Sequence, residues 1–62
     1  MSKPITKLKD FREKRFLSQT ELAVMAGVTQ GTISKAENGE KVSLGSIKKI
    51  AKALKVKPGL LV

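Results

Sequence analysis

Few of the 62 residues carry side chains that could perform covalent chemistry. The sequence has no histidine, which removes the commonest general base and metal ligand at neutral pH, and no cysteine, which removes every thiolate. Tyrosine is absent as well, and the serines and five acidic residues show no spacing that would set two carboxylates in one apolar pocket. The composition therefore argues against an enzyme, and no cofactor or metal is expected.

The side chains best suited to specific hydrogen bonding lie in the short segment 29–37. On a helical wheel Ile33 and Ala36 share one face, which predicts that this face is buried. The opposite face carries an amide, a hydroxyl and an ammonium group, which together can donate and accept hydrogen bonds. Its residues are Gln30, Gly31, Ser34 and Lys35. A generic solvated helix would expose the same residue types, so composition alone does not assign them a role.

Charge is distributed unevenly along the chain. The formal net charge is +8. Residues 1–17 hold six basic and two acidic side chains, residues 18–40 one basic and three acidic, and residues 41–62 six basic and none acidic. Such a balance favours an anionic partner, which could be nucleic acid, an acidic protein or anionic lipid. The plainer interpretation is a soluble surface rich in lysine.

Length limits the architecture to one small domain. Hydrophobic residues make up 40% of the chain and aromatic residues only 3%, so the core must be aliphatic. No run of about 18 apolar residues could span a membrane, and the N-terminus has no apolar signal-peptide region. A cytoplasmic location is the default expectation. Without disulfides or metals, stability must come from well-packed helices or a partner.

The hydrophobic pattern predicts helices, and no segment alternates over the length of a strand. The first helix is expected from about Pro4 to Arg15, because proline fits a first helical turn. Apolar residues of this helix make one stripe: Ile5, Leu8 and Phe11. Arg12 falls inside that stripe, so it should need a partner.

Two further helices follow around a tight turn. Ser18 and Glu21 form a capping box at the start of the second helix, and Gly27 is expected to end it. Leu22, Ala23 and Ala26 share its buried face. Thr29 is a plausible N-cap for the third helix, which the Asn38-Gly39 pair should end.

The fourth helix is the clearest amphipathic segment. Ser43 is its expected N-cap and Leu54 its approximate end, with one apolar and one lysine-rich side. The apolar side consists of Leu44, Ile47, Ile50, Ala51 and Leu54, and the other of Lys48, Lys49, Lys52 and Lys55. A fifth, short turn is expected after Pro58, using Leu60 and Leu61. Five helices in 62 residues predict an all-α bundle.

The stretch from Ser18 to Gly39 closely resembles the helix-turn-helix of the phage-repressor family (Cro-like, or XRE-type). The matching residues are Ser18-Gln19-x-Glu21-Leu22-Ala23-x-x-Ala26-Gly27-Val28-Thr29 and Ile33-Ser34-x-x-Glu37-Asn38-Gly39. The run Lys49–Val56 resembles the fourth helix of that family. The resemblance covers nearly all of the chain. It implies a compact five-helix repressor-like DNA-binding domain over residues 1–62, with the helix-turn-helix at about 18–38.

The resemblance also implies how DNA would be contacted. In such repressors the second helix of the motif lies in the major groove with its N-terminal end foremost. The residues expected to read bases are Thr29, Gln30, Gly31, Ser34 and Lys35. A glutamine can pair with adenine and a lysine can donate to guanine. Gly31 departs from the usual longer side chain, so either one contact is missing or the backbone approaches DNA closely.

Phosphate contacts are expected from residues around this helix. The candidates are Gln19, Thr32, Asn38, Lys41, Lys7 and Lys9, together with the first N–H groups of the second helix. The lysines of the fourth helix are equally well explained as a solvated face.

Resemblance to the family also predicts an ion pair between Arg12 and Glu37. The alternative is that the two residues are independent surface charges.

The sequence departs from the usual pattern of the family in two places. Phe16 occupies a position where relatives often have a helix-ending glycine. Val24 and Met25 replace residues that are usually polar, and they either form a contact patch or are scattered exposed side chains.

The sequence therefore favours a sequence-specific transcriptional regulator that binds double-stranded DNA in the cytoplasm, at the nucleoid. A unit this small would act on an inverted repeat as a homodimer that is weak or forms only on DNA. The alternative is an interaction module on the same fold, such as an antitoxin that binds a toxin or a larger regulator. A membrane-surface role for the fourth helix is a weaker alternative, because its apolar side is needed for the core.

Overall fold

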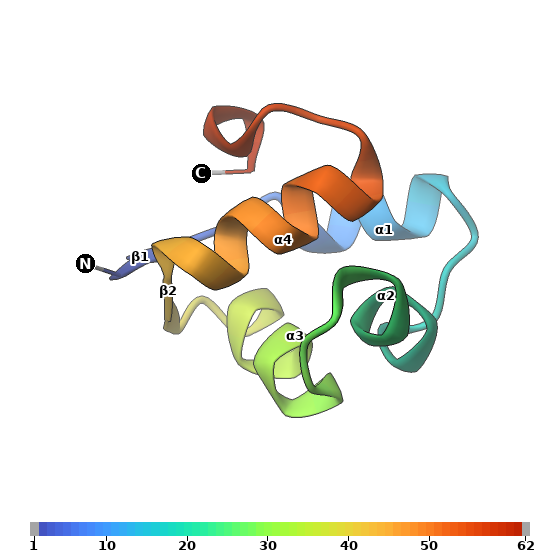
Figure 1. Ribbon diagram of the computed structural model, residues 1–62, viewed down its shortest axis with the longest axis horizontal. Coiled ribbons are helices and arrows are strands. Elements are labelled where there is room, and N and C mark those ends of the chain that lie inside the picture. The colour runs from blue at the N-terminus through green and yellow to red at the C-terminus, as the bar shows by residue number, and fades with distance from the viewer. Residues whose placement is uncertain (1, 62) are drawn as a thin grey trace.

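Four α-helices and a short antiparallel sheet make up residues 2–61, the part of the chain that the computed structural model describes (Figure 1). The predicted helical fold with a helix-turn-helix is confirmed, although a single 3-10 turn, η1, replaces the expected fifth helix. The elements in order are β1 (Ser2–Pro4), α1 (Leu8–Lys14), α2 (Gln19–Ala26), α3 (Gln30–Glu37), β2 (Lys41–Ser43), α4 (Leu44–Leu54) and η1 (Pro58–Leu60).

The starts of α2, α3 and α4 are fixed by the predicted N-caps. The Ser18 hydroxyl accepts a hydrogen bond from the Glu21 N–H at 3.0 Å, and the Glu21 carboxylate accepts one from the Ser18 N–H at 2.9 Å. The hydroxyls of Thr29 and Ser43 each accept from the N–H three residues later, both at 3.2 Å. Each cap pairs an N–H that the helix itself leaves without an acceptor.

The turn between α2 and α3 depends on Gly27. Its φ of 72° lies in the left-handed region, where a side chain would be strained. Its N–H bonds to the carbonyl of Val24, and the N–H of Val28 bonds to that of Ala23, so the last carbonyls of α2 are paired. This geometry ends α2 abruptly and lets α3 leave at a sharp angle.

The core is aliphatic, as the composition predicts. Its largest fully buried side chains come from every part of the chain between Ile5 and Leu61, so all four helices contribute to one cluster. The fully buried large residues are Ile5, Leu8, Leu22, Ile33, Ile47, Ile50, Leu54 and Leu61. The small residues Ala23 on α2 and Ala36 on α3 are also buried. Leu44 is only half-buried, and Leu60 is exposed although Leu61 is buried.

The predicted start of the first helix is wrong. Pro4 lies in β1, opposite Lys41, and α1 begins only at Leu8 after a turn. Pairing with β2 holds residues 2–4 extended, and a proline is tolerated there because a short edge strand can lack one donor. Ile5 is buried as predicted, but it packs from the turn before α1 and not from the helix.

The two-stranded sheet is the element that the sequence pattern did not reveal. β1 pairs with β2 antiparallel, with Lys3 opposite Val42. Three residues are too few for an alternating pattern to be detected, and the partner strand lies almost forty residues away. The sheet ties the N-terminal segment to the connection between α3 and α4.

Within residues 2–61, no helix has both the length and the apolar character needed to cross a bilayer.

Candidate nucleic-acid interface

The N-terminal ends of α2 and α3 meet through their first side chains. The Gln30 amide nitrogen donates to the Gln19 amide oxygen at 2.7 Å. The Gln19 amide nitrogen in turn donates to the Glu37 carboxylate at 3.0 Å. Gln30 is exposed, Gln19 half-buried and Glu37 more deeply placed, so the three form a chain that leads inward from the tip of α3.

The inner end of that chain is Arg12. Two nitrogens of Arg12 donate to the two carboxylate oxygens of Glu37. Nε donates to Oε2, and Nη2 donates to Oε1 at 3.1 Å. The remaining Nη1 donates to the Leu17 carbonyl at 2.7 Å. Only 12% of the Arg12 side chain and 5% of the Glu37 side chain is exposed. This forked geometry joins the end of α1 to the end of α3 and to the segment that enters α2.

Both charges of the pair are favoured by their surroundings. Burial raises the pKa of Glu37. Hydrogen bonds from Arg12 and Gln19 lower it, as do the positive charges of Arg12 and Lys9. The lowering effects together exceed the effect of burial, so the pKa lies below its usual value. The pKa of Arg12 is raised, first by its hydrogen bond to Glu37, which again exceeds the opposing effect of burial. Glu37 is therefore an anion with three committed hydrogen bonds at neutral pH.

The outer face of α3 carries most of the residues that the sequence assigns to base reading. Thr29, Gln30, Gly31 and Lys35 are exposed, and Ser34 is half-buried. A methyl group built onto Gly31 would meet only the Thr29 hydroxyl, at 3.9 Å, so the protein's own packing does not require a glycine there. The hydroxyls of Thr29 and Thr32 lie 2.9 Å apart and are hydrogen-bonded to each other.

The predicted phosphate contacts are spread over several elements. Lys9 lies near enough to Glu37 to lower its pKa, which places it beside the end of α3. Asn38 and Lys41 are exposed just beyond that helix. Lys7 is exposed too, but its backbone N–H bonds to the Leu61 carbonyl at 3.1 Å, so it sits beside the C-terminal turn.

Sequence reasoning missed the role of Gln19 as a bridge. The family resemblance predicts a phosphate contact for Gln19, whereas in the structure its amide also joins Glu37 to Gln30. The signal was present in part, because Gln19 and Gln30 are the first residues of the two helices, but their contact depends on the angle of the turn at Gly27. The exposed apolar residues Val24 and Met25 lie at the other end of α2.

Comparisons with known proteins agree with this geometry. The sequence profile of the helix-turn-helix family matches residues 8–61. The chain is 43% identical over 51 residues to an uncharacterized HTH-type transcriptional regulator, RghRB, of Bacillus subtilis (strain 168); the match covers 79% of this chain but only 37% of that protein. The chain therefore spans well under half the length of this relative.

Two solved structures have the same fold. The restriction-modification controller protein C.AhdI from Aeromonas hydrophila superposes with a TM-score of 0.84 at 34% identity, covering 92% of this chain and 88% of that one. The hypothetical transcription factor NHTF from Neisseria superposes with a TM-score of 0.80 at 32% identity, covering 89% and 63%. Sequence motif, geometry and relatives agree: the chain belongs to the XRE-type helix-turn-helix family.

Proposed function

We propose that this chain is a sequence-specific regulator that inserts α3 into the major groove of double-stranded DNA. The observation that carries the proposal is the position of Gln30, which is exposed at the tip of α3 and held by Gln19. A side chain fixed by a hydrogen bond loses less conformational freedom on binding than a free one. Gln30 is thus prepared for contact with a base.

The proposed contacts divide into base reading and positioning. Gln30 pairs with adenine and Lys35 donates to guanine, while Ser34 and Thr29 make smaller contacts and Gly31 lets the backbone approach. Contacts to phosphate fix the register of the helix without reading sequence. We assign these to the N–H groups at the start of α2 and to Gln19, Thr32, Asn38, Lys41, Lys9 and Lys7.

We further propose that two copies bind an inverted repeat. Half-sites one helical turn apart are separated by about 34 Å. The longest dimension of the described chain is 28 Å, so two copies fit side by side on one face of a duplex. We assign the contact between them to the segment after Gly39 and to the C-terminal turn, where Leu60 is exposed. Dimerisation would be weak, or would occur only on DNA.

The decisive experiment is selection of binding sites from random duplex DNA with the purified chain. We expect an enriched palindrome whose half-sites contain adenine opposite Gln30. Affinity for the selected site and for random DNA is then measured across a range of salt concentrations, because phosphate contacts make both salt-dependent. Binding that varies with salt but ignores sequence would refute the proposal. Selection with Gln30→Ala is the control, and it should lose the adenine preference.

A further inference from the structure

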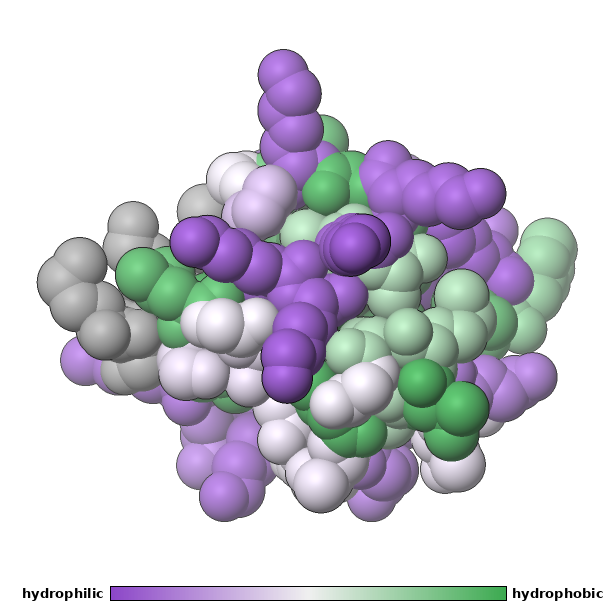
Figure 2. All heavy atoms as spheres, in the orientation of Figure 1, coloured by the Kyte–Doolittle hydropathy of each residue, from purple (hydrophilic) through white to green (hydrophobic). Residues whose placement is uncertain are grey.

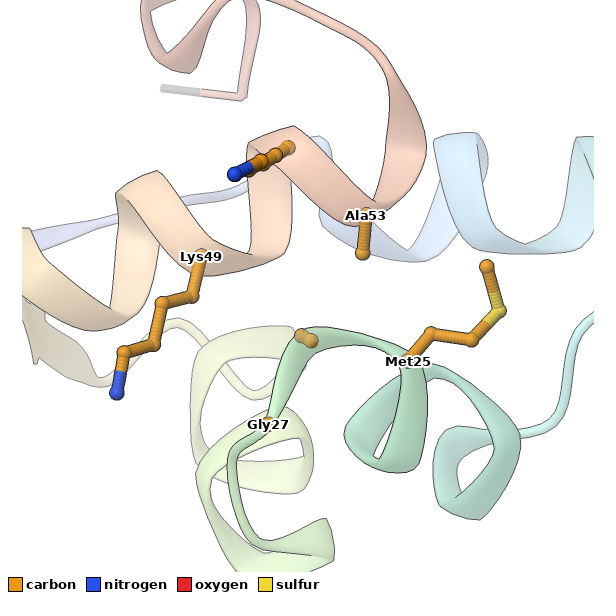
Figure 3. A pocket seen from close by; sticks show the side chains of 6 residues that line it. Met25, Gly27, Lys49 and Ala53 are labelled. Atoms are coloured by element: carbon orange, nitrogen blue, oxygen red, sulfur yellow. The ribbon is translucent and has the colours of Figure 1, made fainter.

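A groove runs between the C-terminal end of α2 and the C-terminal half of α4, with a volume of about 490 Å³. Figure 3 shows Lys49 and Ala53 on the α4 side, with Met25 and Gly27 on the α2 side. Ala26 and Lys52 complete the lining. The volume is within the range of about 300–1,000 Å³ that holds small molecules or anchoring side chains in proteins.

The inside of the groove suits an apolar side chain. Gly27 has no side chain and Ala26 and Ala53 have small ones, so the space between the two helices is left unfilled. Met25 borders it with 54% of its surface exposed. Methionine is flexible and adapts to the shape of a partner. An apolar group entering here would cover a side chain that the fold itself leaves in water.

The rim of the groove is positively charged. Lys49 and Lys52 are exposed, and the sequence has no acidic residue from position 41 onward. Among residues 5–61 the one ion pair is that of Arg12 and Glu37, so no carboxylate there holds either lysine. Figure 2 shows strongly hydrophilic side chains gathered over α4 beside hydrophobic surface over α2. The charge at this rim is therefore available to a partner.

The groove lies away from the proposed DNA contacts. Met25 is six residues beyond Gln19 on α2, which is about 9 Å along the helix axis. None of the residues assigned to bases or phosphates lines it. A partner seated in the groove and a DNA duplex at the tips of α2 and α3 would therefore occupy different parts of the chain.

We propose that this groove docks an acidic segment of a partner protein, with one apolar side chain of that segment inserted beside Met25 and carboxylates facing Lys49 and Lys52. A second copy of the chain is a poor occupant, because its net charge of +8 opposes the cationic rim and two of its five carboxylates are already committed, Glu37 to Arg12 and Glu21 to its capping box. A nucleic acid would offer phosphates to the lysines but nothing apolar to Met25. The combination of an apolar interior and a cationic rim favours an acidic peptide.

The test uses two synthetic peptides and the isotope-labelled chain in the absence of DNA. One peptide is rich in glutamate with a single leucine, and the other has serine in place of the leucine. Amide chemical shifts should change at Met25, Gly27, Lys49 and Ala53 with the first peptide, and those at Gln30 should not change. The serine peptide should bind about tenfold more weakly, and binding of both should weaken as salt is raised.

Matched variants separate the groove from general charge. A double variant with Lys49→Glu and Lys52→Glu should weaken binding of the leucine peptide about tenfold or more. The control is a double variant with Lys48→Glu and Lys57→Glu, which makes the same change in net charge outside the groove. This control should have a much smaller effect on binding. Met25→Gln should weaken binding, and Val24→Gln, its exposed neighbour outside the groove, should not.

Three outcomes would overturn the proposal. The first is that the peptide shifts map to the tip of α3 or spread over all lysines. The second is equal loss of binding in the two charge-reversal pairs. The third is that a DNA duplex or inorganic polyphosphate shifts the same groove amides as strongly as the peptide does, which would identify the rim as a phosphate site. None of these results depends on whether the chain recognises an operator.

Discussion

The side-chain amide of Gln30, at the tip of α3, donates a hydrogen bond to the side-chain amide of Gln19, at the start of α2. Gln19 is itself bound to Glu37, and Glu37 to Arg12. The orientation of an exposed side chain is thus linked through two intermediates to a mostly buried ion pair. This arrangement connects the stability of the domain with the geometry of its proposed recognition surface.

Replacing Gln30 with alanine should reduce affinity for the selected DNA site by about 1–3 kcal/mol, because a bidentate contact to one base is lost. Affinity for random DNA should be nearly unchanged, since it depends on phosphate contacts. Fluorescence anisotropy with both duplexes measures the two values. Gln19→Ala serves as the comparison and should weaken binding to both. Equal losses for the two duplexes with Gln30→Ala would contradict a role in base reading.

Removing one member of the Arg12–Glu37 pair should be strongly destabilising. With so little of either side chain exposed, Arg12→Met or Glu37→Met leaves a buried charge without its partner, at a cost of about 3–5 kcal/mol in the free energy of unfolding. The double variant removes both charges and should recover much of that loss. Urea denaturation of the four proteins provides a double-mutant cycle. If the two single losses simply add, the pair is not coupled.

Stability should fall in acid, and Glu37 should be a principal cause. Its pKa is below the ordinary value of 4.5 in the folded chain, so the unfolded state binds a proton first as pH decreases. The contribution of Glu37 to stability is complete when the pH is above its ordinary pKa of 4.5. That contribution is lost as the pH falls through the lowered pKa of the folded state. The pKa of Glu21 is also lowered, mainly by the backbone hydrogen bond from Ser18, so part of the slope has a second source.

Glu37→Gln should therefore show a shallower loss of stability between about pH 5 and pH 2 than the unaltered chain, while some slope remains from Glu21. Thermal melts across this range measure both profiles. Glu40→Gln, which removes an exposed carboxylate outside the Arg12–Glu37 pair, is the control for the loss of a single negative charge. A Glu37→Gln profile as steep as the original would rule out Glu37 as the group concerned.

Phe16→Gly should stabilise the domain. Phe16 has a φ of 55°, and 94% of its surface is exposed, so it occupies a left-handed conformation without burying its ring. Glycine relieves the strain but adds freedom to the unfolded chain, which leaves a net gain of about 0.5–1 kcal/mol. Chemical denaturation measures the change. Phe16→Ala keeps the Cβ atom and therefore most of the backbone strain, so it should raise the free energy of unfolding much less. If Phe16→Ala and Phe16→Gly stabilise the domain equally, the effect comes from removal of the exposed ring and not from relief of strain.

Gly31→Ala distinguishes between the two interpretations of that glycine. A methyl group at this position would make only an ordinary contact with the Thr29 hydroxyl, at 3.9 Å, so alanine should stabilise α3 by about 0.5–1 kcal/mol. We expect DNA affinity to fall at the same time, because the added methyl group separates the α3 backbone from the duplex. Stability and affinity are measured on the same preparation. Unchanged or improved affinity would mean that the backbone does not approach DNA closely at this position.

Local sequence signals were sufficient for the middle of the fold. The caps at Ser18, Thr29 and Ser43, and the turn at Gly27, involve residues only a few positions apart, and the structure confirms all of them. The family resemblance and the buried stripe together placed Arg12 opposite Glu37. The amphipathic pattern of α4 likewise gave its bounds correctly.

The remaining features depend on contacts between distant segments. The local sequence around Pro4 predicts the start of a helix, and only the pairing with β2 shows that this residue lies in a strand. The bond between Gln19 and Glu37, and the groove between α2 and α4, exist only because the helices pack at particular angles. No pattern within a single segment contains that information, which is why the bridge and the groove were found in the structure alone.

The pairing of β1 with β2 has a consequence for synthesis on the ribosome. Chains are made from the N-terminus, so β1 leaves the ribosome before β2 does. The strand that follows α3 therefore finds its complement already in solution when it emerges. Leu61, which is buried, is the last of the core residues to emerge, so the core can be completed only after α4 and the turn that follows it are free of the ribosome.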